Sequence, residues 1–184
     1  MSLLKPLNNF VMSSSFDYQS FLKTGKLKEK EFADLLVLNE GGTVTYSNYN
    51  TDTRDHIDIF WTKNDKTVSF DVKGLKKNNR SDDTIDSDIH WIEIANVKGN
   101  LGWLYGKADY IAFETLEDWM IVRRVDIIDL VNLKVINKSI SKSKDFYTLY
   151  QRYGRQDIIV KVPTSDLRRI AKKVFKKITN EKDL

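Results

Sequence analysis

The chain has 184 residues, of which 41% are hydrophobic and 30% charged, and its formal net charge is +4. This length fits one compact domain spanning residues 1–184, and the aromatic content of 11% excludes a disordered chain. Because the sequence has no Cys and only two His, it excludes a disulfide framework, a thiol nucleophile and a histidine-rich metal site. Carboxylates remain as metal ligands, and they favour hard cations such as Mg²⁺ or Mn²⁺.

No apolar run approaches the roughly 18 residues that a membrane-spanning helix needs, and the N-terminal segment lacks the pattern of a secretory signal. We therefore expect no membrane partner and a cytoplasmic location. The sequence also lacks the GxxxxGK[ST] loop that cradles nucleotide phosphates, so we expect no nucleotide cofactor.

Hydrophobic periodicity predicts alternating helices and strands along the chain. A helix is expected over residues 17–38, ended by Gly41-Gly42, and a strand at 43–46 precedes a polar loop at 47–54. This order predicts an α/β or α+β sheet. We expect an α/β fold with a mixed central sheet flanked by helices, its core at about 17–135 and a basic C-terminal strand and helix at about 155–180. The remaining expected elements are a hairpin of strands 56–61 and 67–73, a polar loop at 74–88, strands at 89–95, 109–114, 119–123 and 157–162, and helices at 125–131 and 165–178.

The hairpin has the most informative pattern of side chains. If its turn centres on Asn64-Asp65, one face of the strand pair is wholly apolar and faces the core. The pairs expected on the apolar face are Ile57 with Val72, Ile59 with Phe70, and Trp61 with Val68. The pairs expected on the other face are His56 with Lys73, Asp58 with Asp71, and Phe60 with Ser69.

This register places the carboxylates of Asp58 and Asp71 directly across from each other, an arrangement that is destabilising unless a cation bridges them or water screens them. Lys73 lies two residues beyond Asp71 and projects from the same face. Two carboxylates and an amine can form a hydrolytic centre in which a divalent ion lowers the pKa of a bound water, while the Lys orients that water or stabilises charge on a phosphate. The alternative is an exposed strand face that carries these residues without such a role.

The first predicted helix supplies another carboxylate. Glu29 precedes Phe32, Ala33 and Leu36 by three, four and seven residues, so it lies on the face that packs against the sheet. Glu31 shares a side with Leu35 and not with that stripe. A carboxylate on a packing face needs a partner, and a metal held by the two Asp residues would supply one.

Glu29 on a helix, then Asp58, then Asp71-Val72-Lys73 on a hairpin resembles the PD-(D/E)XK nuclease superfamily. The segment from Gly25 to Phe32, with the thirteen-residue step between the two Asp residues, is similar to archaeal-type Holliday junction resolvases. The resemblance covers residues 25–75, with a looser fit near 109–113. It departs from the pattern at Ile57, where the superfamily name has Pro, and at Asp71, where Glu is commoner.

The resemblance implies a restriction-endonuclease-like fold and Mg²⁺-dependent cleavage of DNA phosphodiesters, with branched or junction DNA as the substrate. It implies that Glu29, Asp58, Asp71 and the Val72 carbonyl bind the metal and that Lys73 assists catalysis. Two alternatives stay open: a restriction-type or exonucleolytic member of the same superfamily, and a DNA-binding module that keeps the fold without cleavage.

Further residues are candidates around this centre. The stretch from Trp91 to Lys107, with three glycines, aromatics and lysines, resembles a segment of phage-type nucleases of the superfamily and makes Glu93 a possible additional active-site acid; a structural turn with core aromatics is the alternative. Basic residues beside the hairpin and in this loop are expected to contact DNA phosphates: Lys76, Lys77, Arg80, Lys98 and Lys107.

The charge is unevenly distributed, because residues 161–184 contain eight Lys and Arg but only three Asp and Glu. A basic segment beside a near-neutral body is compatible with DNA binding, and a solvated helix face explains it equally well. The apolar stripe of the helix expected at 165–178 is a candidate core or dimer contact. A homodimer would place two active sites on a branched substrate.

Overall fold

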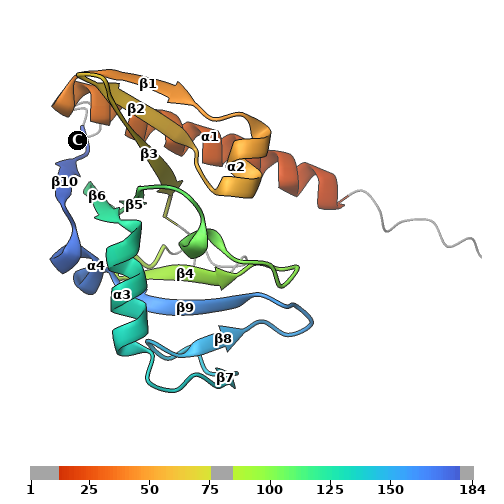
Figure 1. Cartoon of the computed structure of the whole chain (residues 1–184). Coiled ribbons are helices and arrows are strands. Elements are labelled where there is room, and N and C mark those ends of the chain that lie inside the picture. Colours follow the sequence, from red (N-terminus) through yellow and green to blue (C-terminus); the bar gives the residue numbers. More distant parts are fainter. Residues whose placement is uncertain (1–12, 76–84, 179–184) are drawn as a thin grey trace, which may run out of the picture.

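The computed structural model describes residues 13–75 and 85–178, and it is a mixed α/β protein with two sheets flanked by helices (Figure 1). The helices are α1 (Ser13–Glu40), α2 (Tyr49–Asp55), the 3-10 turn η1 (Trp103–Tyr105), α3 (Arg124–Lys134) and α4 (Thr164–Ile170). The strands are β1 (Thr43–Tyr46), β2 (Ile59–Lys63), β3 (Lys66–Lys73), β4 (Ile89–Ala95), β5 (Tyr110–Glu114), β6 (Asp118–Arg123), β7 (Ile140–Ser141), β8 (Leu149–Gln151), β9 (Ile158–Pro163) and β10 (Lys173–Lys176).

The strands form two sheets where the sequence predicted one. The first has six strands in the order β1-β2-β3-β5-β6-β10, with β3 and β5 parallel and the other neighbours antiparallel. The second has four strands in the order β4-β9-β8-β7, with only β7 and β8 parallel. The expected α/β class is confirmed. The single central sheet is wrong, because β4 pairs with β9 instead of joining the hairpin strands.

The predicted hairpin register is confirmed where β2 and β3 form a ladder. Ile59 pairs with Phe70 and Trp61 with Val68, and Asn64 and Asp65 take the left-handed backbone of a tight turn, with φ of 50° and 59°. The ladder ends before Asp58, whose N–H donates to the Phe70 carbonyl at 2.8 Å.

Three expected pairs at this end of the hairpin are therefore corrected. The pairs His56 with Lys73, Ile57 with Val72 and Asp58 with Asp71 lie outside the ladder, because β2 begins at Ile59, whose partner is Phe70. Ile57 packs with Trp103 and Leu104 in the core beneath the other face of the sheet. Val72 packs with the core under α1.

Helix α1 covers one face of the six-stranded sheet. Its buried side chains Phe32 and Leu36 pack against Ile59, Phe70 and Trp119, and the rings of Phe32 and Phe70 meet edge to face with centroids 5.4 Å apart. The predicted phase of this helix is confirmed by these contacts. Gly41 and Gly42 end it with φ of 70° and 81°. Leu27 and Leu38, although apolar, are exposed on its other side.

Two other segments differ from the prediction. Most of the segment 47–54, expected as a polar loop, belongs to α2, because the Asn48 side chain caps the helix by accepting the Thr51 N–H. Residues 165–178 are not one helix. Helix α4 ends at Ile170 and β10 pairs with β6, since Phe175 packs into the core under α1.

The predicted apolar stripe of a C-terminal helix is consequently wrong. Leu167 is fully buried, while Val174 and Ile178 are exposed by 40% and 67%. The dimer contact expected from that stripe has no basis in this arrangement. None of the described helices is both long enough and apolar enough to cross a membrane.

Candidate active site

The end of the β2–β3 hairpin next to α1 brings together four of the predicted site residues. Glu29 comes from the buried face of α1, Asp58 immediately precedes β2, and Asp71 and Lys73 lie at the end of β3. The charge of Asp58 raises the pKa of both Glu29 and Asp71, which shows that the three carboxylates are neighbours. Elements separated by a long stretch of sequence therefore converge on one acidic cluster.

Asp71 is the most buried member of this cluster, with 2% of its surface exposed. Lys73 Nζ donates to its Oδ1, whereas its Oδ2 has no hydrogen-bond partner among the described residues. Burial raises the pKa of Asp71 well above its usual range, with the charge of Lys73 opposing and that of Asp58 reinforcing the shift. The free oxygen is an acceptor that the fold leaves open at the centre of the site.

Asp58 is also buried and has a structural bond. Its Oδ2 accepts the Val72 N–H at 2.6 Å, taking the place of a backbone carbonyl where the β2–β3 ladder has ended. This bond fixes the Asp58 carboxylate beside Asp71. The metal-binding role expected of the Val72 carbonyl stays a prediction.

Lys73 is held between carboxylates and an aromatic ring. Its Nζ lies 5.1 Å from the centroid of the Trp103 ring. Burial lowers the pKa of Lys73, but the charges of Asp71, Asp58 and Glu93 outweigh burial and raise it above its ordinary value. Lys73 is therefore a cation at neutral pH.

Glu29 occupies the position that helical phase predicted. It is 6% exposed, and burial raises its pKa, while Lys26 bonds to it at 2.8 Å. Lys26 also lies 3.5 Å from Asp52 of α2, so it bridges α1 and α2 beside the site. Glu31 points elsewhere: its side chain is 41% exposed and pairs with Lys28.

Glu93 reaches the neighbourhood of the site from the second sheet. It lies on β4, and its charge contributes to the raised pKa of Lys73. The loop after β4 folds back on it, since a Cβ on Gly102 would lie 2.4 Å from the Glu93 carbonyl oxygen. Only glycine permits this approach, which places Trp103 beneath Lys73.

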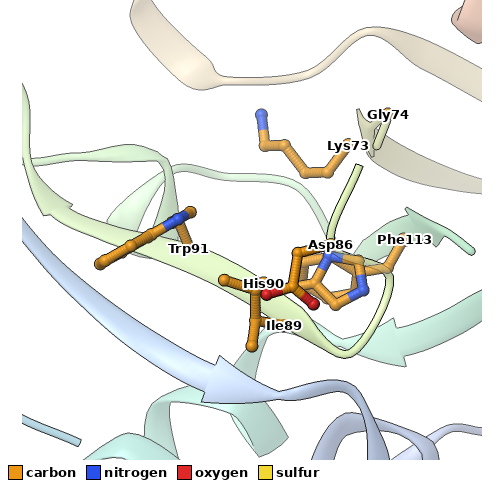
Figure 2. A pocket seen from close by; sticks show the side chains of 7 residues that line it. All are labelled: Lys73, Gly74, Asp86, Ile89, His90, Trp91 and Phe113. Atoms are coloured by element: carbon orange, nitrogen blue, oxygen red, sulfur yellow. The ribbon is translucent and has the colours of Figure 1, made fainter. Parts of the chain in front are cut away.

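A small cavity of about 20 Å³ adjoins the cluster, enough for one water molecule. Figure 2 shows Lys73 on one side of it and Ile89, His90 and Trp91 of β4 on the other. Burial lowers the pKa of His90 to about 4, and its Nε2 has no hydrogen-bond partner among the described residues. Sequence reasoning missed His90, because the residue pattern of a single strand does not show which other element packs against each of its side chains.

A second buried acid was also missed. Glu114, at the end of β5, is 1% exposed and accepts bonds from Lys28 at 2.9 Å, Lys177 at 2.6 Å and the Leu75 N–H at 2.9 Å. These bonds tie α1, the exit of β3 and the C-terminal segment together. Glu114 thereby braces the strand that carries Asp71 and Lys73.

The predicted DNA-contacting residues have different surroundings. Lys98 is exposed in the turn after β4, and Lys107 pairs with Asp55 at 2.9 Å. Lys76, Lys77 and Arg80 lie outside the described residues.

The basic C-terminal segment is largely paired with acids of the body. Ion pairs join five of its Lys and Arg residues to carboxylates on five different elements or loops of the body, and a sixth pair lies within the segment, so its excess charge holds the segment in place. The pairs are Arg168–Asp118, Arg169–Asp166, Lys172–Asp126, Lys173–Glu40, Lys176–Glu117 and Lys177–Glu114.

The carboxylates of this cluster suit a magnesium ion that takes only one or two ligands from the protein. Within the described residues, no three His, Asp or Glu side chains are arranged closely enough to hold a metal by themselves. Mg²⁺ in enzymes is commonly bound by one or two carboxylates, with water and substrate phosphate completing its shell. Asp58 and the unpaired Oδ2 of Asp71 match that requirement.

Comparisons of the chain with protein-family models, with curated proteins and with solved structures find no match.

Proposed function

We propose that this protein is a metal-dependent deoxyribonuclease that hydrolyses phosphodiester bonds at the cluster of Glu29, Asp58, Asp71 and Lys73. The observation that carries the proposal is the buried Asp71, which has one oxygen paired with Lys73 and the other unpaired beside Asp58. A buried carboxylate oxygen without a partner destabilises the fold, so the presence of Asp71 in the core favours a catalytic role. The resemblance to PD-(D/E)XK nucleases supplies the reaction class and a restriction-endonuclease-like fold.

Asp58 and Asp71 would hold a Mg²⁺ or Mn²⁺ ion, with Glu29 completing the arrangement or orienting water. When bound, such an ion supplies Lewis-acid activation of water and of the scissile phosphate. Lys73, which stays protonated, is placed to stabilise negative charge on a phosphate oxygen. Val72 contributes its N–H to hold Asp58 in position.

Nicking of supercoiled plasmid DNA tests the proposal, with Mg²⁺ in one arm and EDTA in the other. We expect Mg²⁺-dependent nicking that Asp71→Asn and Lys73→Met abolish. Matched controls come from the far end of the same hairpin, where Asp65→Asn and Lys66→Met change exposed residues. Equal nicking by all four variants would overturn the assignment of this site.

The form of the products separates the finer alternatives. Cleavage of circular DNA would indicate an endonuclease, whereas activity restricted to linear DNA would indicate an exonuclease of the same superfamily. Comparison of a four-way junction with a linear duplex of the same sequence tests the proposed preference for branched DNA. Sedimentation tests the proposed homodimer.

A DNA-binding module without cleavage is the second candidate. It is favoured by the bond between Lys73 and Asp71, because an ammonium that neutralises the carboxylate does the work of a metal ion. This candidate predicts DNA binding that is the same in Mg²⁺ and in EDTA, with no nicking in either.

A further inference from the structure

The outer face of the second sheet carries aromatic rings and lysines together. Alternate residues of β4 and β9 are buried, including Ile92 and Val160, and they belong to the same core cluster as Ile127 and Val131 of α3. Figure 1 shows β4 and β9 side by side in the second sheet. The intervening residues of these strands point to the opposite side. We define the outer face by its rings and lysines: Trp91, Lys144, Phe146, Tyr150 and Lys161.

These side chains form one continuous surface. The ring centroids of Trp91 and Tyr150 lie 6.1 Å apart, and Lys161 is the backbone partner of Trp91 in the β4–β9 ladder. Lys161 Nζ is 4.7 Å from the centroid of Phe146, and Lys144 Nζ is 5.6 Å from that of Tyr150. Phe146 is 48% exposed, and the other two rings are half-buried.

Rings accompanied by ammonium groups indicate a ligand with flat faces and negative charge. An exposed cation–π contact is weak, so each lysine can turn to a phosphate while its ring accepts a base. Bases in a duplex are stacked on each other and present no face to a protein ring, whereas unpaired bases do. Two acids lie near this face: Asp145, whose carboxylate accepts a bond from the Ser143 hydroxyl, and Glu93, whose charge contributes to the raised pKa of Lys73.

We propose that the outer face binds single-stranded nucleic acid by stacking bases on Phe146, Tyr150 and Trp91. This inference rests on the proposed nuclease function, since the bound strand would be its substrate. Trp91 belongs to the outer face and also lines the cavity beside Lys73. A strand lying on β4 therefore leads towards the catalytic cluster. The substrate class becomes DNA with an unpaired segment next to the cleavage site.

Fluorescence anisotropy with a labelled oligothymidylate of about 20 nucleotides, measured in EDTA, tests the proposal without cleavage. Base–ring stacking predicts that Phe146→Ala and Tyr150→Ala each raise the Kd at least about fivefold. Tyr150→Phe keeps the ring and is expected to bind as the wild type does. Tyr49→Ala, which removes an exposed ring on α2, is the matched control.

The lysines are tested by salt dependence. Each phosphate contact on a single strand contributes about 0.7 to the slope of log K against log salt. Lys144→Gln with Lys161→Gln should thus lower the slope by about 1.4. Lys66→Gln, at the exposed hairpin turn, should leave it unchanged.

Wild-type binding of oligothymidylate that the two Ala variants do not weaken would overturn the proposal, as would tighter binding to duplex than to the single strand. No binding of the oligonucleotide by the wild type would also overturn it. Because these measurements need no metal, they are independent of plasmid nicking. Nicking by a protein that fails this test leaves the nuclease proposal standing, and binding without nicking removes only that proposal.

Discussion

Replacing Lys73 with Met removes the ammonium that faces the buried carboxylate of Asp71 and lies near the Trp103 ring, while it keeps an unbranched apolar side chain at this position. Asp71 would then be a desolvated anion beside Asp58, with neither oxygen bonded to a cation. Breaking a buried ion pair in this way costs about 3–5 kcal/mol. Because the Lys73 side chain is 21% exposed, we expect the lower end, about 3 kcal/mol, or about 6–12 °C in Tm.

The cost should depend on pH in a defined direction. The folded state raises the pKa of Asp71, so it binds that proton more tightly than the unfolded chain, whose Asp pKa is about 4. Asp71 therefore destabilises the fold as pH rises from about 4 through its folded pKa. The stability difference between Lys73→Met and wild type should be small at the acid end of this window and larger at pH 8.

Urea unfolding in EDTA at pH 5 and pH 8 measures both effects. The double variant Lys73→Met/Asp71→Asn should recover to within about 1 kcal/mol of wild type, because it removes both charges of the pair. Added Mg²⁺ should stabilise Lys73→Met by about 2.7 kcal/mol at a hundred times its Kd. A cost that is equal at both pH values, or that persists in the double variant, would refute the reasoning.

Three further predictions concern other residues. Glu29→Gln should lower nicking by orders of magnitude and Glu31→Gln only mildly, because Glu29 alone lies buried beside Asp58; the reverse order would show that α1 is wrongly phased. In urea unfolding, wild type should lose about 3 kcal/mol of stability relative to His90→Phe as pH falls from 6.5 to 4, because the unfolded chain protonates His90 first. Phe175→Ala should cost about 3–5 kcal/mol in thermal unfolding and Val174→Ala little, whereas equal costs would contradict the β10 strand.

Local chemistry decided the parts of this protein that the sequence predicts correctly. A strand alternates its side chains with a period of two, so the turn at Asn64-Asp65 and the apolar residues of the hairpin allow only one register. Helical periodicity likewise places Glu29, and not Glu31, on the face of Phe32 and Leu36. Both patterns depend on neighbours within a few residues, which is why the burial of Glu29 and the register of β2 with β3 could be predicted from the sequence.

Long-range packing decided the rest. Lys173-Val174-Phe175-Lys176 suits a helix or a strand, and its pairing with β6 and the burial of Phe175 under α1 select the strand. The division into two sheets follows from the pairing of β4 with β9, two strands that are far apart in the chain. The bonds that complete the site, from Lys73 to Asp71, from Lys26 to Glu29 and around Glu114, depend on which side chains meet when these elements pack. Residue type and spacing indicate which chemical groups a site contains. The hydrogen-bond partners and burial of each group, and therefore its pKa, are set only when segments distant in sequence pack together and exclude water.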